Sequence, residues 1–472
     1  MPTRLLDVGT VASPDLKLVL SRSYTVGPYA TLSHCWGKAR IHTTTIARLA
    51  QHLQSISLSA LPRTFKDAIS ITRRLGLRFL WIDSLCIVQD DEMDWFREAA
   101  AMASVYGNSY ITLMASRSSS SGESFLEPRW RPVVIKEETN KYGHKLSFHL
   151  VNSRFHENSI HRATNNVRHP LHKRAWVLQE RSLSRRKLLF CEDQVFWECK
   201  QLATSEDGQM AEKMVEKTSF TLDEWYETVE RYTACDITYD KDVLPALAGI
   251  ARRFAQTNGF SYCAGIWLDR LIDCLLWYPH NVYGKKRKRE VYVAPTFSWA
   301  SSQGPVRYRG RRASRHTFCN CLSYQQDLPD NSSDDFGAIA SAAIVLEGPV
   351  LKVARLIRHE AGINLVLKLQ NGQRYVMPVD FDHADTQCEP ASTVVLLLYD
   401  DESRMQALVL YRASNEPSGS VYVRIGISWC PYHELLKMNW WGNIVQADDQ
   451  QEQLREFVQQ VMGHPREAVT LV

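Results

Sequence analysis

The N-terminal fold is decided by residues 61–89, LPRTFKDAISITRRLGLRFLWIDSLCIVQ. The first part predicts a helix that opens at Leu61-Pro62 and is capped by Gly76, because apolar side chains recur every three or four residues. The second part, residues 78–83, is short, apolar and aromatic, which is typical of a buried central strand. A helix followed at once by a buried strand indicates an α/β sheet.

Neighbouring segments continue this pattern on both sides. Residues 29–36 predict a buried strand that ends at Gly37, residues 95–106 a second helix, and residues 110–115 a third strand. The order strand, helix, strand, helix, strand favours a parallel sheet with right-handed crossovers. Ligands bind beyond the carboxyl ends of such strands. The segments expected at that edge are 33–37, 83–89 and 116–119.

The remainder of the chain divides by pattern. From about residue 342, apolar and polar residues alternate around a turn at Asn371-Gly372, which predicts a β-rich C-terminal unit. Residues 220–280 are mainly helical in pattern, and the polar segment 325–335 is the best linker candidate. The predicted parts are residues 1–200 with a core at about 29–200, a helical and Trp-rich annex at 201–324, and the β-rich unit at 336–472.

Composition excludes several classes of protein. The chain of 472 residues has a net charge of only +4 and no apolar run of the roughly 18 residues that span a bilayer. Its 11 cysteines are scattered without a CxxC pair, which is typical of a reduced, cytoplasmic protein. We expect neither a membrane nor a nucleic-acid partner, since the basic run 285–289 reads best as a solvated loop. The 13 tryptophans indicate a fold that uses indole side chains repeatedly.

Polar residues at the expected sheet edge are candidates for chemistry. Asp83 ends the predicted strand, where it would either face a crevice as a catalytic carboxylate or cap the following turn. Trp36 and Trp81 would either fill the core or form a stacking platform. The adjacent His34-Cys35 pair lacks the flanking ligand spacing of a zinc site, so we expect no metal and no bound cofactor.

A second polar cluster follows Trp176, which would anchor its segment in the core. Glu180 would supply a functional carboxylate, with Arg174 or Arg181 as its counter-charge. The alternative is an ion-pair network that holds this segment against the sheet, and both interpretations stay open.

Four blocks resemble the fungal heterokaryon-incompatibility (HET) domain. They are TLSHCWG (31–37), LPRTFKDAISITRRLGLRFLWIDSLCIVQDDEMDW (61–95), REAAAMASVYGNSYITLMAS (97–116) and RAWVLQERSLS (174–184), and the likeness continues in Trp-rich segments to about residue 300. The departures are small: His34, Ala175 and Ser182 stand where Tyr, Gly and Leu are usual.

The resemblance implies a fold like flavodoxin and the Toll/interleukin-receptor (TIR) domain, some members of which cleave NAD through a glutamate. By that analogy Glu180 or Asp83 would be the catalytic carboxylate. Cys86 would be a nucleophile with His34 as the nearest base, although a buried structural role is more usual for cysteine. The candidate catalytic residues are Asp83, Glu180, Cys86 and His34. The candidate binding residues are Ser33, Trp36, Gly37, Trp81, Ser84, Gln89, Ser116, Arg174, Trp176, Gln179 and Arg181.

Three functions follow as alternatives. The resemblance implies an effector of non-self recognition and programmed cell death, which meets a protein partner (an incompatibility factor) and acts by NAD or nucleotide hydrolysis. The chain has neither a GxxxxGKS/T phosphate loop nor internal repeats. A second interpretation is therefore a stand-alone enzyme of secondary metabolism that cyclises a small-molecule substrate, a terpenoid or polyketide, without a cofactor. The third is a binding module that acts as a homo-oligomer.

Overall fold

The computed structural model describes residues 1–472 except 11–14, 24–25, 39–41, 129–132, 140–141, 144, 151–168, 209, 215–218, 281–290, 309–315, 331, 360–361, 384–385, 387, 401–403, 414–420, 432–435, 439–443 and 446–449. The predicted basic loop at 285–289 lies outside the described residues. The chain forms two compact units. Unit 1 comprises Met1–Ser219, Cys235–Ile237 and Pro245–Ile250, and unit 2 comprises Phe220–Ala234, Thr238–Leu244 and Ala251–Val472.

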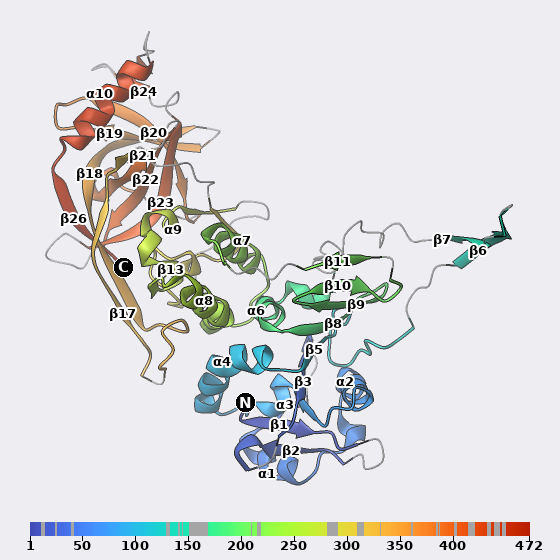
Figure 1. The fold of residues 1–472 in the computed structure, drawn as a ribbon. Helices are drawn as coiled ribbons and strands as arrows, with labels where there is room; N and C mark the ends of the chain where they lie inside the picture. The colour runs from blue at the N-terminus through green and yellow to red at the C-terminus, as the bar shows by residue number, and fades with distance from the viewer. Residues whose placement is uncertain are drawn as a thin grey trace. The chain divides into compact units, whose positions relative to one another are not determined.

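Unit 1 is built on a nine-stranded mixed sheet in the order β11-β10-β9-β8-β5-β3-β4-β1-β2 (Figure 1). Its strands are β1 (Arg4–Asp7), β2 (Lys17–Leu20), β3 (Tyr29–Ser33), β4 (Phe79–Trp81), β5 (Ile111–Met114), β8 (Arg186–Phe190), β9 (Val195–Cys199), β10 (Leu202–Ser205) and β11 (Ala211–Lys213). The four central strands β8, β5, β3 and β4 are parallel. The flanking pairings are antiparallel. A separate antiparallel pair is formed by β6 (Val133–Thr139) and β7 (Lys145–Leu150).

The helices of unit 1 connect these strands. They are α1 (Ile46–Gln54), α2 (Arg63–Arg74), α3 (Asp83–Cys86), α4 (Glu92–Gly107) and α6 (Ala175–Leu183). The helix α2 starts after Pro62, whose fixed φ suits a helix start, and it ends before Gly76 at φ +72°. Asp91 caps α4 by accepting a hydrogen bond from the Asp94 N–H. The helix α4 packs against α6, which carries Glu180.

The predicted α/β class with parallel strands is confirmed for the centre of this sheet, while its two flanks are antiparallel. Asp83 does not end a strand: β4 stops at Trp81 and Asp83 begins the short helix α3. The core between sheet and helices contains Phe65, Trp81 and Tyr106, all almost completely buried.

The first part of unit 2 is helical and rich in buried tryptophan. Its helices are α7 (Leu222–Thr233), the part of α8 (Pro245–Asn258) from Ala251 on, and α9 (Leu271–Cys274), with short strand pairs β12 (Tyr262–Cys263) with β13 (Ile266–Trp267) and β14 (Trp277–Pro279) with β15 (Val306–Tyr308). Trp225, Trp267, Trp277 and Trp299 are fully buried. Trp225 and Trp267 meet edge-on at 5.0 Å, and Trp267 stacks on Phe254 at 4.6 Å, so these tryptophans form core.

The second part of unit 2 is an 11-stranded sheet, which confirms the predicted β-rich C-terminal region. Its strands are β16 (His316–Thr317), β17 (Asn320–Asp327), β18 (Ser341–His359), β19 (Gly362–Lys368), β20 (Arg374–Phe381), β21 (Thr393–Asp400), β22 (Arg404–Arg412), β23 (Val421–Pro431), β24 (Leu436–Met438), β25 (Ile444–Val445) and β26 (Arg466–Leu471), accompanied by α10 (Gln450–Met462). Because β21 pairs with β18 and β23 with β20, six strands from β18 to β23 close into a ring. Phe457 and Val461 of α10 join the apolar cluster of these strands.

Two sequence predictions about this region have different outcomes. The hairpin β19–β20 turns at Asn371-Gly372 as predicted, with Gly372 at φ +84°. The predicted linker 325–335 is not wholly irregular, since Gln325–Asp327 complete β17 and pair with Ser341–Ala343. None of the helices in the described part of the chain has the length and apolar character needed to cross a membrane.

Candidate functional site

A group of polar side chains gathers where β3 and β4 end and α6 begins. Residues Ser33 and His34 lie at and just after the end of β3, Asp83 lies two residues after β4, and Arg174 and Glu180 belong to the start and middle of α6. We call Ser33, His34, Trp36, Asp83, Arg174 and Glu180 the edge cluster. The parallel order of β3 and β4 places both strand ends at one edge of the sheet, as expected for a ligand site.

Asp83 joins the two strand ends. One carboxylate oxygen accepts a hydrogen bond of 2.8 Å from the indole nitrogen of Trp36. The other accepts one of 2.7 Å from the backbone N–H of Ser84, which is the local capping contact that the sequence left open. The Asp83 side chain is 17% exposed, so it is one of the members of the edge cluster that reach solvent.

His34 is a buried neutral imidazole. Its ring is 2% exposed and meets Phe65 edge-on at 5.1 Å. Burial lowers the pKa of His34 to about 4, with Asp83 acting to raise it and Arg174 to lower it further. Its Nδ1 lies 3.8 Å from Asp83 Oδ1, which is beyond hydrogen-bond distance. The His34 ring therefore lies beside Asp83 but does not donate a hydrogen bond to its carboxylate.

Glu180 has a buried carboxyl group with a raised pKa. It is 3% exposed, and burial raises its pKa to about 7. Arg174 opposes this increase first, followed by the nearby hydroxyl of Ser33, while Asp83 adds to it. A carboxyl group poised near neutral pH can act either as an acid or as a base.

Arg174 is the cation of the edge cluster. It occupies the N-cap position of α6, and its guanidinium donates a hydrogen bond to the backbone carbonyl of His34. It is only partly buried, so its remaining N–H groups are available at the surface side of the site. A guanidinium placed in this way suits a carboxylate or phosphate of a ligand.

Several buried polar atoms around the edge cluster are unsatisfied. The Ser33 hydroxyl, both ring nitrogens of His34, the Ser84 hydroxyl and Glu180 Oε2 find no partner of ordinary hydrogen-bond geometry within the described part of the chain. Leaving such atoms unpaired costs about 1–3 kcal/mol each, so native proteins seldom gather them without a function. This grouping makes the edge cluster a candidate ligand site.

The position of α6 is fixed from both ends. At its start, the backbone N–H of Ala175 donates to the Asp236 carbonyl at 3.0 Å. At its end, the Ser184 hydroxyl bonds the Glu180 carbonyl at 2.6 Å and the Thr112 hydroxyl of β5 at 2.6 Å. Glu180 is therefore presented by a helix tied to the sheet.

Two predicted site residues have structural roles instead. The Gln179 side chain accepts a hydrogen bond of 2.6 Å from the Gly249 N–H. Arg181 pairs with Glu198 of β9, so the counter-charge of Glu180 is Arg174 and the predicted ion-pair network also exists. Both residues hold α6 in place.

Cys86 lies in a different environment from His34. Its thiol is completely buried in the core, and burial raises its pKa to about 12. Its charged neighbours are Arg4 and Glu98, whereas those of His34 are Asp83 and Arg174. The predicted pairing of this thiol with His34 is therefore not supported, and we leave Cys86 out of the proposed chemistry.

The remaining predicted residues frame the site. Gly37 has φ +80°, and a Cβ there would lie 2.4 Å from that of Ser120. This strand end therefore touches the serine-rich loop, residues 116–122. Ser116 Oγ lies 3.4 Å from His172 Nε2, and Gln89 donates to the Asp83 carbonyl at 3.2 Å. Trp81 is completely buried, and Trp176 is half-buried against the core.

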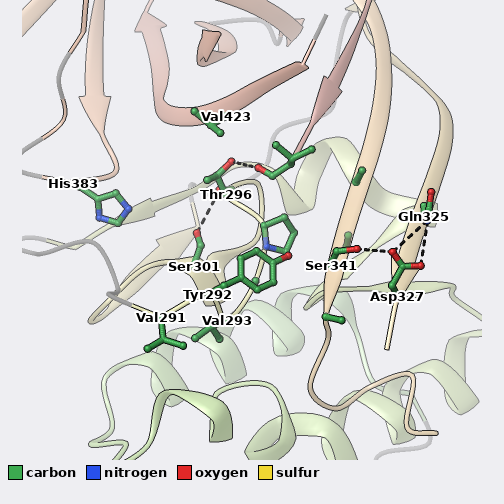
Figure 2. Close-up of a pocket in the computed structure, with 16 residues that line it drawn as sticks. Val291, Tyr292, Val293, Thr296, Ser301, Gln325, Asp327, Ser341, His383 and Val423 are labelled. Carbon is green, nitrogen blue, oxygen red and sulfur yellow. Dashed lines mark hydrogen bonds between the residues drawn. The ribbon is translucent and has the colours of Figure 1, made fainter. Parts of the chain in front are cut away.

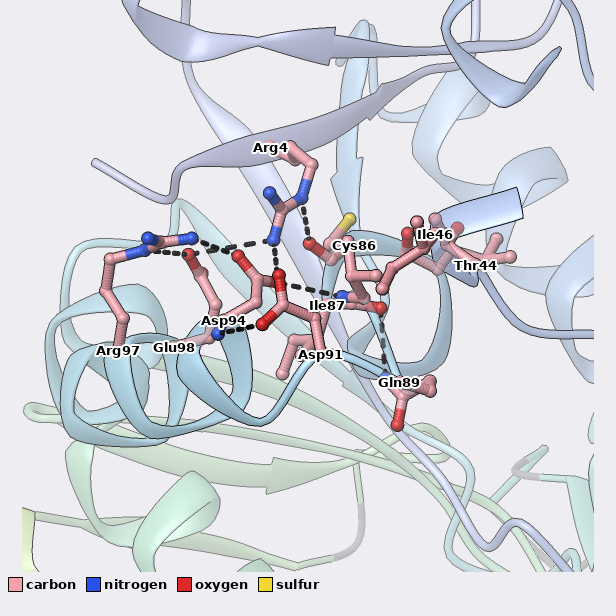
Figure 3. A network of polar contacts seen from close by, with 12 residues as sticks. Arg4, Thr44, Ile46, Cys86, Ile87, Gln89, Asp91, Asp94, Arg97 and Glu98 are labelled. Atoms are coloured by element: carbon pink, nitrogen blue, oxygen red, sulfur yellow. Dashed lines mark hydrogen bonds and ion pairs between the residues drawn. The ribbon is translucent and has the colours of Figure 1, made fainter. Parts of the chain in front are cut away.

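Sequence reasoning missed two groups. Tyr106, whose pKa is raised well above its usual value by burial and by Glu180, places its hydroxyl beside that carboxyl group. The sequence predicts Tyr106 only as the last residue of the helix at 95–106. The second group joins Arg4 of β1 to Asp94 and Glu98 of α4 (Figure 3). Its charges are spread over 94 positions of sequence, and no local motif marks them.

Among the residues that the structure describes, no three His, Cys, Asp or Glu side chains gather closely enough to hold a metal ion.

Comparison with known proteins identifies one family. Residues 29–180 match the family model described as heterokaryon incompatibility protein (HET). This confirms the resemblance carried by the sequence blocks, and the matched segment includes the whole edge cluster from Ser33 to Glu180. No curated protein and no solved structure matches the chain.

Proposed function

We propose, on the premise of a HET domain at residues 29–180, that this chain is an effector of heterokaryon incompatibility whose edge cluster hydrolyses NAD. The family match implies the incompatibility-related role. NAD hydrolysis goes beyond the family match, and we infer it by analogy with TIR domains. The observation that carries it is Glu180, a buried carboxyl group with a pKa of about 7, an unpaired oxygen and a guanidinium beside it.

The reaction is cleavage of the bond between nicotinamide and the ribose of NAD. As that bond breaks, its electrons leave with neutral nicotinamide and positive charge develops on the ribose carbon. Ionised Glu180 would stabilise that charge. Water then adds to the ribose carbon and loses a proton, which gives ADP-ribose.

The other members of the edge cluster have matching roles. Arg174 would bind a phosphate of NAD through its free N–H groups. Trp36, fixed by its hydrogen bond to Asp83, would provide an aromatic surface for a planar ring. His34 is neutral at physiological pH and would neither repel the nicotinamide cation nor compete for the phosphate.

The test is expression of the full chain in a host whose growth and NAD content are followed together. Wild type should arrest growth and deplete NAD. Glu180→Gln keeps the shape of the side chain and should lower NAD consumption by about 100-fold or more. Glu127→Gln is the matched control, because Glu127 is exposed and pairs with Arg63 at the surface.

Two outcomes would overturn the proposal in different ways. Growth arrest with unchanged NAD in wild type would remove the hydrolysis and leave the effector role. Full NAD depletion by Glu180→Gln would remove this residue as the catalytic carboxylate.

A further inference from the structure

Unit 2 contains a cavity of about 680 Å³, in the range of small-molecule sites (Figure 2). It lies between the segment 291–296, the end of β17 and the start of β18. It is lined by Val291, Tyr292, Val293, Ala294, Pro295, Thr296, Ser301, Gln325, Asp327, Ala340, Ser341, Ala342, Ala343, His383, Val423 and Val472. Part of this wall is the block APTFSWAS (294–301), which the proposed hydrolysis does not use.

One wall of the cavity is rigidly supported. The Thr296 hydroxyl donates to the Val472 main-chain oxygen at 2.6 Å and accepts from the Arg424 N–H at 2.9 Å. Arg424 is itself fully buried, where it pairs with Asp382 at 2.9 Å and lies 3.7 Å from the ring centre of Trp277. A wall fixed in this way is preorganised, so ligand binding would not need to order it.

The opposite side of the cavity carries a negative charge. Figure 2 shows Asp327 beside Gln325 and Ser341, across the cavity from His383. The Asp327 carboxylate accepts hydrogen bonds from the Ser341 hydroxyl at 2.5 Å and from the Gln325 amide at 3.2 Å. These bonds lower the pKa of Asp327, so the group is ionised at neutral pH. Among the described residues that line the cavity there is no Lys or Arg to neutralise it.

An aromatic ring lies at the same end. The Tyr292 hydroxyl is close to the backbone of Ala342, the neighbour of Ser341, which bonds Asp327. Tyr292 is 52% exposed and its ring stands in the cavity in Figure 2. A carboxylate with an aromatic ring in the same cavity attracts an organic ammonium group.

The rest of the lining is mainly small and apolar. Val291, Val293 and Val423 face the space together with the alanines at the start of β18. Such a lining favours an apolar body, while its few polar groups fix orientation. The combination selects against purely hydrophilic cations, which would lose hydration without gaining apolar contact.

We propose that this cavity binds a small amphipathic amine, with its apolar body between the valines and its ammonium group at Asp327 and Tyr292. The site is separate from the edge cluster and lies outside the segment that matches the HET family. The chain would thus contain a binding site for a cationic small molecule in addition to its effector domain.

The test uses three probes with one indole body: tryptamine, neutral tryptophol and anionic indoleacetate. Calorimetry on the full chain should give saturable binding in the order tryptamine, tryptophol, indoleacetate. Asp327→Asn should weaken tryptamine binding by about fivefold or less and leave tryptophol binding unchanged, as expected for an ion pair with an exposed carboxylate. Asp330→Asn is the matched control, because it removes the same charge three positions along without touching the cavity. Ala343→Leu fills the space and should reduce binding of all three probes, with circular dichroism to verify folding.

The proposal is overturned by any of three results. They are equal affinity for the three probes, equal effects of Asp327→Asn and Asp330→Asn, and no saturable tryptamine binding by the folded wild-type chain. None of these measurements depends on NAD hydrolysis.

Discussion

The Trp36 indole nitrogen donates a 2.8 Å hydrogen bond to Asp83, which ties the end of β3 to the start of α3 across 47 positions of sequence. A hydrogen bond to a charged acceptor contributes about 1.5–3 kcal/mol when it is shielded from water, and somewhat less where its partner is partly exposed, as Asp83 is.

We expect Trp36→Phe, which keeps an aromatic ring but removes the N–H, to lower the opening free energy of unit 1 by about 1–2 kcal/mol. Native-state hydrogen exchange of the β3 and β5 amides measures this quantity within unit 1. In a double-mutant cycle with Asp83→Asn, the two losses should not add. Additive losses would mean that this hydrogen bond contributes nothing.

The raised pKa of Glu180 predicts a pH-dependent stability. The folded state holds the proton more tightly than the unfolded state, so the stabilisation is complete below the ordinary pKa of 4.5 and is lost as the pH rises through about 7. Urea unfolding should lose on the order of 3 kcal/mol between about pH 4.5 and about pH 8 from this group.

Glu180→Gln is the control for this dependence, because a permanently neutral amide should flatten that part of the pH profile. Glu127→Gln should leave it unchanged, since Glu127 is exposed. A wild-type profile that stays flat over the same window would contradict the assignment.

The cluster in Figure 3 predicts two very different arginine variants. Arg4 is 6% exposed and contacts both Asp94 and Glu98, and it also donates to the Cys86 carbonyl at 2.7 Å. Arg4→Met should cost about 3–5 kcal/mol, because it leaves two buried carboxyl groups without their central cation.

Arg97 touches the same two carboxyl groups but is 60% exposed, so Arg97→Met should cost less than about 1 kcal/mol. Hydrogen exchange of the β1 and β4 amides distinguishes the two variants. Equal losses would mean that burial does not set the strength of these ion pairs.

Two glycines separate backbone strain from steric overlap. Both have positive φ, but a Cβ at Gly76 meets nothing within 4 Å, whereas one at Gly37 lies 2.4 Å from Ser120 Cβ. Gly76→Ala should therefore cost about 1 kcal/mol from conformation, and Gly37→Ala at least about 1 kcal/mol more, because the serine-rich loop must move. Thermal unfolding compares them directly, and a larger loss for Gly76→Ala would refute the contact.

The sequence predicted the centre of unit 1 because its signals are local. The helix between Pro62 and Gly76 and the buried strand after it each carry their own periodicity and caps. The helix α6 was missed for a physical reason: it buries Gln179 and Glu180 beside apolar residues, so no apolar stripe separates from a polar one.

The sequence brings candidate residues to one edge of the sheet but does not fix their charge neighbours. The predicted strand ends made His34 and Asp83 candidates, because the carboxyl edge of a parallel sheet collects functional residues. Glu180 became a candidate from the polar cluster after Trp176 and from the family resemblance. That Arg174 is the nearby positive charge of Glu180, while Arg181 pairs with Glu198, depends on the direction in which α6 presents successive side chains. The cavity at Asp327 and Tyr292 could not be foreseen, since it joins a presumed linker to an unrelated segment of the annex.

The two units alternate along the chain between residues 219 and 251, which limits where the sequence can be cut or recombined. Unit 1 includes residues 235–237 and 245–250. From these segments, the Asp236 carbonyl accepts a hydrogen bond from the Ala175 N–H, and the Gly249 N–H donates one to the Gln179 side chain, next to Glu180. A recombination junction or truncation at residue 219 would separate the helix from these supports. Unit 1 is therefore not a segment that can be exchanged by one crossover at residue 219, and a chimera that keeps these supports would inherit residues 1–250 as a single block.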